Sequence, residues 1–240
     1  MKNNRLSLLL TFSSYAIGVA AGMLLILVAA WGDMESASYG FSRLANAGLR
    51  GLRCPVLMTR SETGRIALQV SNTTDSQISP SIRAQISTSS LQPEEFVDHI
   101  QVAPGASQTL EWKVDSENID LGSFIFAKVL FFSAYPIPSQ ETTCGILVVD
   151  LPGSGQVIVS VLVVLSLAGM GGGLYQINRL PALKDWRRKH LGSITFLASM
   201  VVLGLVFSFT GGWISTLLVL VITLLTALII VSTVLAGRVR

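Results

Sequence analysis

The residues of this sequence that could do chemistry are few. The chain has two cysteines, Cys54 and Cys144, and two histidines, His99 and His190. Two thiols in a reducing compartment would indicate metal or redox chemistry, whereas two thiols in an oxidising compartment would indicate a disulfide. An apolar segment long enough to cross a membrane separates the histidines, so we expect them not to share a site. The chemistry therefore depends on where the rest of the chain places these side chains.

Other motifs give no catalytic constellation. No His, Cys and carboxylate residues have the spacing of metal ligands. Glu94, Glu95 and Asp98 lie close together, but we expect a solvated acidic turn rather than a cation site. The Gly-Ser-Gly motif at 153–155 has only one histidine on its side of the apolar segment, which favours a hinge over a nucleophile elbow. We predict that the protein is not an enzyme and that it uses no cofactor or metal.

Four long apolar segments contain no Asp, Glu, Lys, Arg or His. Each has 19 to 26 residues, enough for a helix to cross about 30 Å of hydrocarbon. Ion-coupled transporters, proton relays and intramembrane hydrolases usually carry an ionisable residue within a span, so its absence argues against these classes. The predicted spans are Leu6–Trp31, Gln156–Ile177, Leu191–Phe209 and Trp213–Ala236.

The first segment is also similar to a secretory signal peptide, because Lys2 and Arg5 precede it and residues 28–30 resemble a cleavage site. Its apolar stretch of about 25 residues exceeds the roughly 7–15 of a signal peptide, which favours an uncleaved anchor. A lipoprotein is disfavoured, because Arg53 precedes Cys54 where a small residue would be expected.

Charge is distributed unequally along the chain. Residues 33–150 hold 13 acidic and 8 basic residues, a net charge of −5, whereas the rest of the chain holds one acidic and 9 basic residues. Short basic loops stay in the cytoplasm. We therefore predict a plasma-membrane protein with both termini and the loop 179–190 in the cytoplasm and with residues 33–152 outside it. Because the basic residues flank spans, the positive net charge does not indicate nucleic-acid binding.

Between Cys54 and Asp150 the hydrophobic pattern changes to a period of two residues. Three such segments predict strands with one face on a core and one face in water. Phe124–Phe132 is almost entirely apolar and predicts a central strand, and Gly145–Val149 predicts a further strand. Six or seven short strands in about 95 residues fit a two-sheet sandwich. The alternating apolar residues are Ile66, Leu68 and Val70; Ile82, Ala84 and Ile86; and Leu110, Trp112 and Val114.

This block resembles the bacterial immunoglobulin-like adhesion and spacer modules. The resemblance rests on Val70–Thr74 (VSNTT) and on Ala103–Ser107 (APGAS), which precedes a strand. It covers residues 54–150 only and identifies no family for the four-span protein as a whole. It implies an immunoglobulin-like sandwich that recognises carbohydrate or protein, or that spaces other domains.

The same fold would bring the cysteines together. Cys54 would open the first strand and Cys144 the last, and in such a fold these two strands can run side by side and parallel. We predict a disulfide between them, with two buried thiols as the alternative. Closing a loop across the 89 intervening residues would stabilise the domain by about 4–5 kcal/mol, as an upper figure.

The last strand leads toward the second span, so we expect the loops at 71–77, 103–106 and 133–141 at the membrane-distal tip. The third loop carries an aromatic and proline-rich segment, which is a candidate partner contact or an ordinary stiff hairpin loop. The segment consists of Tyr135, Pro136, Ile137 and Pro138. The preceding linker would be partly helical, with an apolar stripe of Phe41, Leu44, Ala45, Leu49 and Leu52.

Small residues in the first two spans predict close helix packing. Gly18 and Gly22 have GxxxG spacing, as do Gly169 and Gly173, and a missing side chain lets helix backbones approach. Packing against another subunit is modestly favoured over packing within this chain.

The leading hypothesis is a non-enzymatic membrane protein that displays an extracytoplasmic immunoglobulin-like domain for recognition, scaffolding or complex assembly. The alternative is an accessory subunit of a transport or export complex that associates through its glycine-rich helices. Both hypotheses place the chain in a lipid bilayer and give it a protein partner. The predicted parts are 1–32 (N-terminus and first helix), 33–53 (linker), 54–152 (sandwich), 153–178 (second helix), 179–190 (loop), 191–236 (helical hairpin) and 237–240 (tail).

Overall fold

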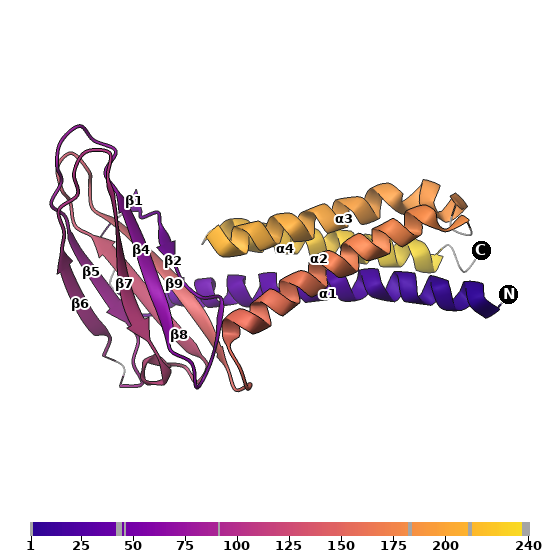
Figure 1. The fold of residues 1–240 in the computed structure, drawn as a ribbon, viewed down its shortest axis with the longest axis horizontal. Coiled ribbons are helices and arrows are strands. Elements are labelled where there is room, and N and C mark those ends of the chain that lie inside the picture. The colour runs from indigo at the N-terminus through magenta and orange to yellow at the C-terminus, as the bar shows by residue number, and fades with distance from the viewer. Residues whose placement is uncertain are drawn as a thin grey trace. The chain divides into compact units, whose positions relative to one another are not determined.

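The computed structural model describes residues 2–41, 45, 47–90, 92–181, 184–210 and 213–236. These residues form two compact units, each with its own hydrophobic core (Figure 1). The strand unit consists mainly of Trp31–Val157. The helical unit consists of the described parts of Met1–Ala30, Ile158–Ser208 and Gly212–Arg240.

The structure has four long helices that contain the four predicted spans, and all four are long and apolar enough to cross a membrane. Two helix ends differ from the prediction. The first helix continues beyond Trp31, and the third starts at Lys184, so that 184–190 is helical rather than a loop. Hydropathy marks only the apolar part of a helix, whereas Lys and Arg are themselves good helix formers. The predicted tail at 237–240 lies outside the described residues. The helices are α1 (Lys2–Ser38), α2 (Gly155–Arg179), α3 (Lys184–Thr210) and α4 (Trp213–Ala236).

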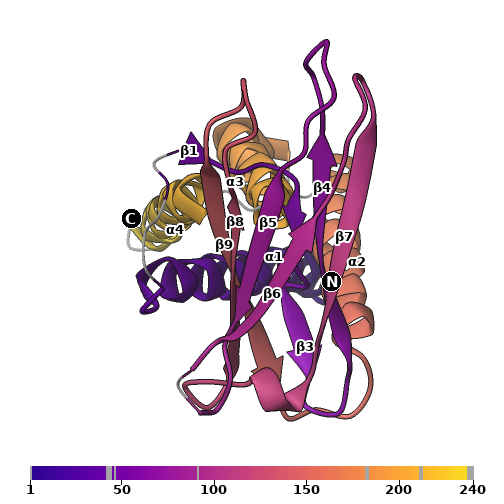
Figure 2. The ribbon, with the colours of Figure 1, turned by 90° about the vertical axis from the view of Figure 1, so that its left-hand side faces the viewer.

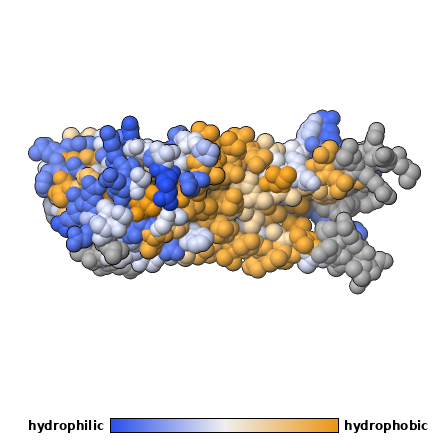
Figure 3. All heavy atoms as spheres, turned by 90° about the horizontal axis from the view of Figure 1, so that it is seen from below, coloured by the Kyte–Doolittle hydropathy of each residue, from blue (hydrophilic) through white to orange (hydrophobic). Residues whose placement is uncertain are grey.

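Within the helical unit, α1 packs against both α2 and α3. Ile26 of α1 is fully buried, and the hydroxyl of Tyr15 donates a hydrogen bond to the carbonyl oxygen of Ile194 on α3. The hydroxyl of Thr11 donates to the side-chain oxygen of Gln176 on α2 at 2.7 Å. Apolar side chains also cover much of the outer surface of these helices (Figure 3). A continuous apolar surface of this kind is typical of helices that face lipid or a partner rather than water.

The strand unit contains two sheets (Figure 2). The larger sheet has six strands in the order β1-β9-β8-β5-β6, with β3 pairing alongside β9, and the smaller sheet has the order β2-β4-β7. The strands are β1 (Ala47–Gly48), β2 (Leu52–Arg53), β3 (Leu57–Thr59), β4 (Gly64–Ser71), β5 (Ser81–Ile86), β6 (Glu94–His99), β7 (Ser107–Val114), β8 (Phe124–Phe131) and β9 (Gln140–Val149).

One hydrophobic cluster receives side chains from both sheets. Ile66 and Leu68 of β4 and Ile82 of β5 are completely buried, while their alternate neighbours face outward, as the period of two predicts. Trp112 and Val114 of β7, in the smaller sheet, are also buried in this cluster. The same alternation therefore defines the inner faces of both sheets.

Strand β8 is buried on both of its faces, which explains its nearly continuous apolar sequence. Residues such as Ile125 face the core between the sheets, whereas Phe126 and Lys128 face the other side. There the ring of Tyr39 stacks on Phe126 with 4.5 Å between centroids, and Lys128 Nζ lies 2.9 Å from Glu141 Oε2. Tyr39, which directly follows α1, thus packs on the second face of the larger sheet.

Three local predictions are wrong. Strand β9 begins at Gln140 rather than Gly145, because its first residues are polar or β-branched and lack an apolar pattern. Glu94, Glu95 and Asp98 belong to edge strand β6 rather than to a turn; the two glutamates are exposed, whereas Asp98 is half-buried and accepts a hydrogen bond from Trp112. The apolar stripe on a linker helix is absent from the described residues: Leu49 and Leu52 instead pack against the core, and Leu44 lies outside them.

Candidate functional site

Three connecting segments meet at one end of the strand unit, which we call the tip. Ile78 and Val102 form a β-bridge, so the first two segments are adjacent. The third segment follows Phe131, which pairs with Ile82 at the start of β5. The structure therefore brings together the three loops that were predicted to be neighbours. The tip consists of residues 72–80, 100–106 and 132–139.

Tyr135 is the most exposed large side chain of the tip, with 95% of its surface accessible. Pro136 and Pro138 are exposed beside it, whereas Ile137 is half-buried and packs against the core. The backbones of Ala134 and Ile137 exchange two hydrogen bonds around this turn. Ile137 therefore anchors the loop that presents Tyr135, and its role as a partner contact stays a prediction.

Asn72 fixes the neighbouring part of the tip. Its side-chain amide donates to the carbonyl oxygens of Ser76 at 2.8 Å and Val102 at 2.9 Å. Its side-chain oxygen accepts the hydroxyl and the backbone N–H of Thr74. Asn72 is 1% exposed, so the Asn-Thr-Thr sequence serves as a structural turn and does not offer its amide nitrogen for glycosylation.

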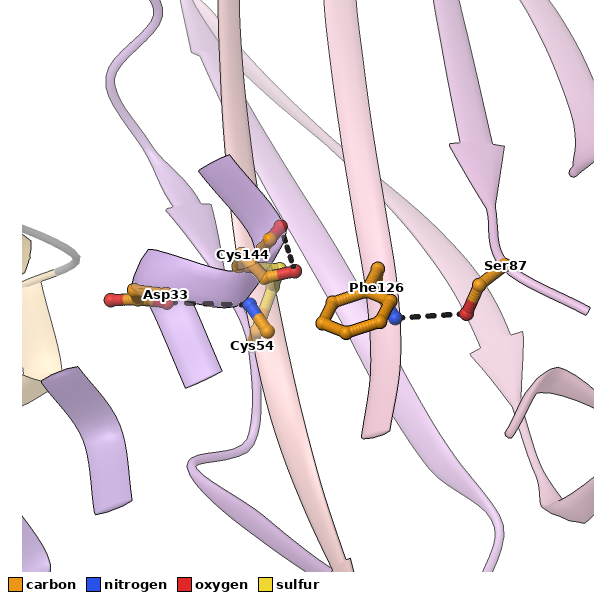
Figure 4. The surroundings of a disulfide bond; sticks show 7 residues. Asp33, Cys54, Ser87, Phe126 and Cys144 are labelled. Carbon is orange, nitrogen blue, oxygen red and sulfur yellow. Dashed lines mark hydrogen bonds between the residues drawn. A yellow bond between two sulfur atoms is a disulfide. The ribbon is translucent and has the colours of Figure 1, made fainter. Parts of the chain in front are cut away.

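Cys54 and Cys144 form a disulfide in the structure, with their Cα atoms 6.4 Å apart (Figure 4). Cys54 lies between β2 and β3, and Cys144 lies within β9, so neither cysteine opens its strand as the sequence suggested. Strand β3 does run parallel to β9, with Leu57 opposite Leu147. The bond fixes the first part of the strand unit to its last strand.

The end of α1 lies against the outward face of β9, directly behind Cys144 (Figure 4). The hydroxyl of Ser36 donates to the carbonyl oxygen of Cys144 at 2.8 Å, and the N–H of Gly145 donates to Asp33 at 3.3 Å. A Cβ atom on Gly145 would lie 1.9 Å from the carbonyl oxygen of Gly32. Two glycines thus let a helix backbone touch a strand backbone, a contact that sequence analysis missed.

The other end of the strand unit, which we call the base, adjoins the start of α2. It consists of residues 59–63, 119–123 and 150–154. The carboxylate of Glu62 accepts the N–H of Gly155 at 2.7 Å, the hydroxyl of Ser154 at 2.8 Å and the N–H of Thr59 at 3.1 Å. An acceptor at the first N–H groups of a helix stabilises the helix terminus. Glu62 therefore caps α2 from another part of the chain.

Replacing Glu62 with Gln should lower the stability of the strand unit by about 1 kcal/mol at neutral pH, a typical loss for a helix cap. Burial alone would raise the pKa of Glu62, but the hydrogen bonds from Gly155, Ser154 and Thr59 outweigh it and lower the pKa. The carboxylate therefore contributes stability that is complete above the ordinary carboxyl pKa of about 4.3 and is lost as the pH falls through the lowered value.

Thermal unfolding of the full chain in detergent, measured at neutral and acidic pH, checks this expectation. The difference between the wild-type protein and Glu62→Gln should shrink in acid. Glu94→Gln on the exposed edge of β6 is the matched control and should change little at either pH. A Glu62→Gln effect that is constant with pH would contradict the capping role.

The four glycines predicted to pack helices lie between helices of this same chain. A Cβ atom on Gly169 would lie 2.8 Å from Cα of Gly18, which joins α2 to α1. Gly173 is equally close to the backbone of Tyr15, and Gly22 faces side chains of α2 and α3. Close packing within the chain thus occupies the surfaces that association of another subunit through these glycines would need.

The remaining candidates for chemistry stay dispersed. His99 lies on β6 and His190 on α3, in different units. Among the described residues, no three His, Cys, Asp or Glu side chains lie close enough to hold a metal ion. An open cleft of about 530 Å³ separates β6 from β7, where the indole N–H of Trp112 donates to Asp98 at 3.1 Å. Half of its lining residues are acidic. The hydrogen bond between Trp112 and Asp98 joins strands of different sheets, and nothing in the sequence predicts it.

No protein family and no curated protein sequence matches this chain. A β-glucuronidase of Bacteroides uniformis is 12% identical over 44% of this chain and 14% of the enzyme, with a TM-score of 0.33. A CARDB domain of Pyrococcus furiosus, solved with di-metal ions, is 11% identical over 45% of this chain and 98% of that domain, with a TM-score of 0.34. These partial similarities are too weak to assign a family or an activity to this chain.

Proposed function

We propose that this protein is an integral membrane protein that holds an immunoglobulin-like sandwich outside the cytoplasm and uses the tip to recognise a protein partner. It is not an enzyme in this proposal. Both termini lie in the cytoplasm, and the strand unit lies on the opposite side of the plasma membrane.

Charge and redox chemistry support the orientation. The basic residues near the N-terminus and in 179–190 favour the cytoplasmic side, and the acidic strand unit favours the other. A disulfide between Cys54 and Cys144 is typical of an oxidising compartment. The two sheets, their shared core and the parallel pairing of β3 with β9 support the immunoglobulin-like sandwich.

The observation that carries the recognition role is the exposure of Tyr135 on an anchored loop. A tyrosine that is 95% exposed gains nothing from the protein's own core. The half-buried Ile137 and the hydrogen bonds of Ala134 hold the loop in place, so little conformational entropy would be lost on binding. Rigid, exposed tyrosines are preferred as anchors of protein interfaces.

The test is carried out in intact cells with the full chain. Tyr135→Cys should react with a membrane-impermeant maleimide, whereas Lys189→Cys should react only after permeabilisation. A photoreactive residue at position 135 should then give a discrete crosslinked partner, and Tyr135→Ser should weaken its capture by about ten-fold or more, as for an interface hot spot.

The matched control is Val97 on β6, whose side chain is 53% exposed in the same unit. A photoreactive residue there should give no such adduct, and Val97→Ser should leave capture unchanged. Equal adducts from positions 97 and 135 would contradict recognition by the tip. Labelling of Lys189→Cys in intact cells would contradict the orientation.

A further inference from the structure

The base carries two leucines that the fold does not bury. The side chain of Leu121 is 62% exposed and that of Leu151 is 53% exposed. The loops that carry them are adjacent, because the N–H of Val148 donates to the carbonyl oxygen of Ser123 at 2.8 Å. Arg60 also joins them, through its N–H to the carbonyl oxygen of Val149 and its guanidinium to that of Gly122. The two leucines therefore lie on one end of the strand unit.

Leu121 is held in a conformation that a leucine rarely adopts. Its φ angle is +45°, and it is the one non-glycine residue with a positive φ among the described residues. Asp120 maintains the turn, because its carboxylate accepts the N–H of Leu121 at 2.7 Å and the hydroxyl of Tyr39. Burial and the Asp120 carboxylate raise the pKa of Tyr39 to about 12, so this hydroxyl keeps donating. A strained conformation that the surrounding structure maintains in this way motivates a hypothesis of function.

The base adjoins two helices that are long and apolar enough to cross a membrane. Leu151 lies four residues before Gly155, the first residue of α2. Trp31, at the end of the apolar run of α1, contacts the ring of Phe124, three residues after Leu121, with 6.2 Å between centroids. Tryptophan favours the headgroup level of a bilayer. Both leucines are thus tied to the points where the chain would leave the membrane.

We propose that the base is a membrane-surface contact, in which Leu121 and Leu151 insert into the boundary between lipid headgroups and acyl chains. This inference rests on the proposed membrane insertion but not on recognition by the tip. Apolar side chains at this depth leave water without losing backbone hydrogen bonds. The strained turn is the device that directs Leu121 away from the core and toward lipid.

The experiment uses the full chain in vesicles of phosphatidylcholine and phosphatidylglycerol. Single cysteines at Leu121, Leu151, Val221 and Tyr135 carry an environment-sensitive fluorophore, and the native cysteines are protected by their disulfide. Position 221 on α4 reports insertion of the spans, and position 135 reports water. We expect labels at 121 and 151 to be quenched several-fold more by lipid-attached spin labels than by aqueous iodide, as at 221.

The inference would be overturned if iodide quenched the labels at 121 and 151 as strongly as the label at 135. If the label at 221 were still quenched by the lipid spin labels in that experiment, the proposed membrane insertion would stand. Iodide quenching at 221 as well would overturn both this inference and the proposed membrane insertion.

A second variant separates a lipid role from a merely structural one. Leu121→Asn keeps the turn, because Asn tolerates a positive φ, and it should reduce lipid quenching at position 151 several-fold. Unchanged quenching at 151 would show that Leu121 does not hold the base at the membrane.

Discussion

Gly145→Ala should destabilise the strand unit by about 3 kcal/mol, the upper end of the usual cost of overpacking. The added Cβ would lie 1.9 Å from the carbonyl oxygen of Gly32 and 2.9 Å from its Cα atom. Both are backbone atoms, so no side-chain rotation can relieve the collision. The helix end would have to leave β9, and the hydrogen bond of Ser36 to Cys144 would be lost with it. Urea titration of the full chain in detergent measures this loss of stability.

Gly48→Ala is the matched control for this prediction. Gly48 lies on β1, which also pairs with β9, but nothing lies within 4 Å of a Cβ atom built there. Its replacement should change stability by less than about 0.5 kcal/mol. If both substitutions lowered the free energy of unfolding equally, the contact with α1 would not be the cause of the loss at Gly145. Ser36→Ala, which removes one hydrogen bond, should cost about 1 kcal/mol.

The contact between Gly32 and Gly145 could not be predicted from the sequence. A glycine inside a strand does indicate that another backbone approaches closely, but the pattern does not say which one. Gly32 directly follows the apolar run that ends at Trp31, and the chain beyond was expected to be a linker. The continuation of α1 to Ser38 depends on tertiary packing against β9, and packing routinely overrides local signals.

The strands that were predicted correctly are those whose apolar residues alternate within a few positions. Ile66 and Ile82 belong to such strands, and both are fully buried. Strand β6 was missed because three of its six residues are acidic and Phe96 is its one apolar residue that packs against the core, so its sequence shows no apolar alternation. The buried pair of Lys128 and Glu141 was missed because polar residues on neighbouring strands give no apolar period.

The tip was predicted in part. The clustering of its three loops was inferred from the expected sandwich and from the last strand leading toward the second span. The burial of Ile137 could not be inferred, because it depends on how the loop folds back on the core. The base gave no sequence signal: Leu121 and Leu151 lie in short loops without an apolar period, and only the backbone of the turn makes Leu121 unusual.

Reduction of the bond between Cys54 and Cys144 should cost about 4–5 kcal/mol, the loop-entropy figure for a closed loop of this length and an upper bound. The structure gives the bond a second role, because Cys144 lies on β9 with α1 on its other face. Loosening β9 would therefore also weaken the contact between β9 and the end of α1. Urea unfolding of the full chain in detergent should shift to lower urea on addition of a reductant.

The double variant Cys54→Ala, Cys144→Ala is the control for the reductant itself. It should unfold at the same low urea concentration with or without reductant, because no bond remains to be reduced. Either single variant should match the double one within about 1 kcal/mol, because Cys144 is buried but a free thiol packs there as a small apolar group. Two thiols that alkylate readily in the native, non-reduced protein would contradict the bond. Protection of both thiols from alkylation, together with a midpoint that falls on addition of reductant, would establish that the disulfide holds β9 in the folded protein, while Gly145→Ala tests the contact of α1 with its other face.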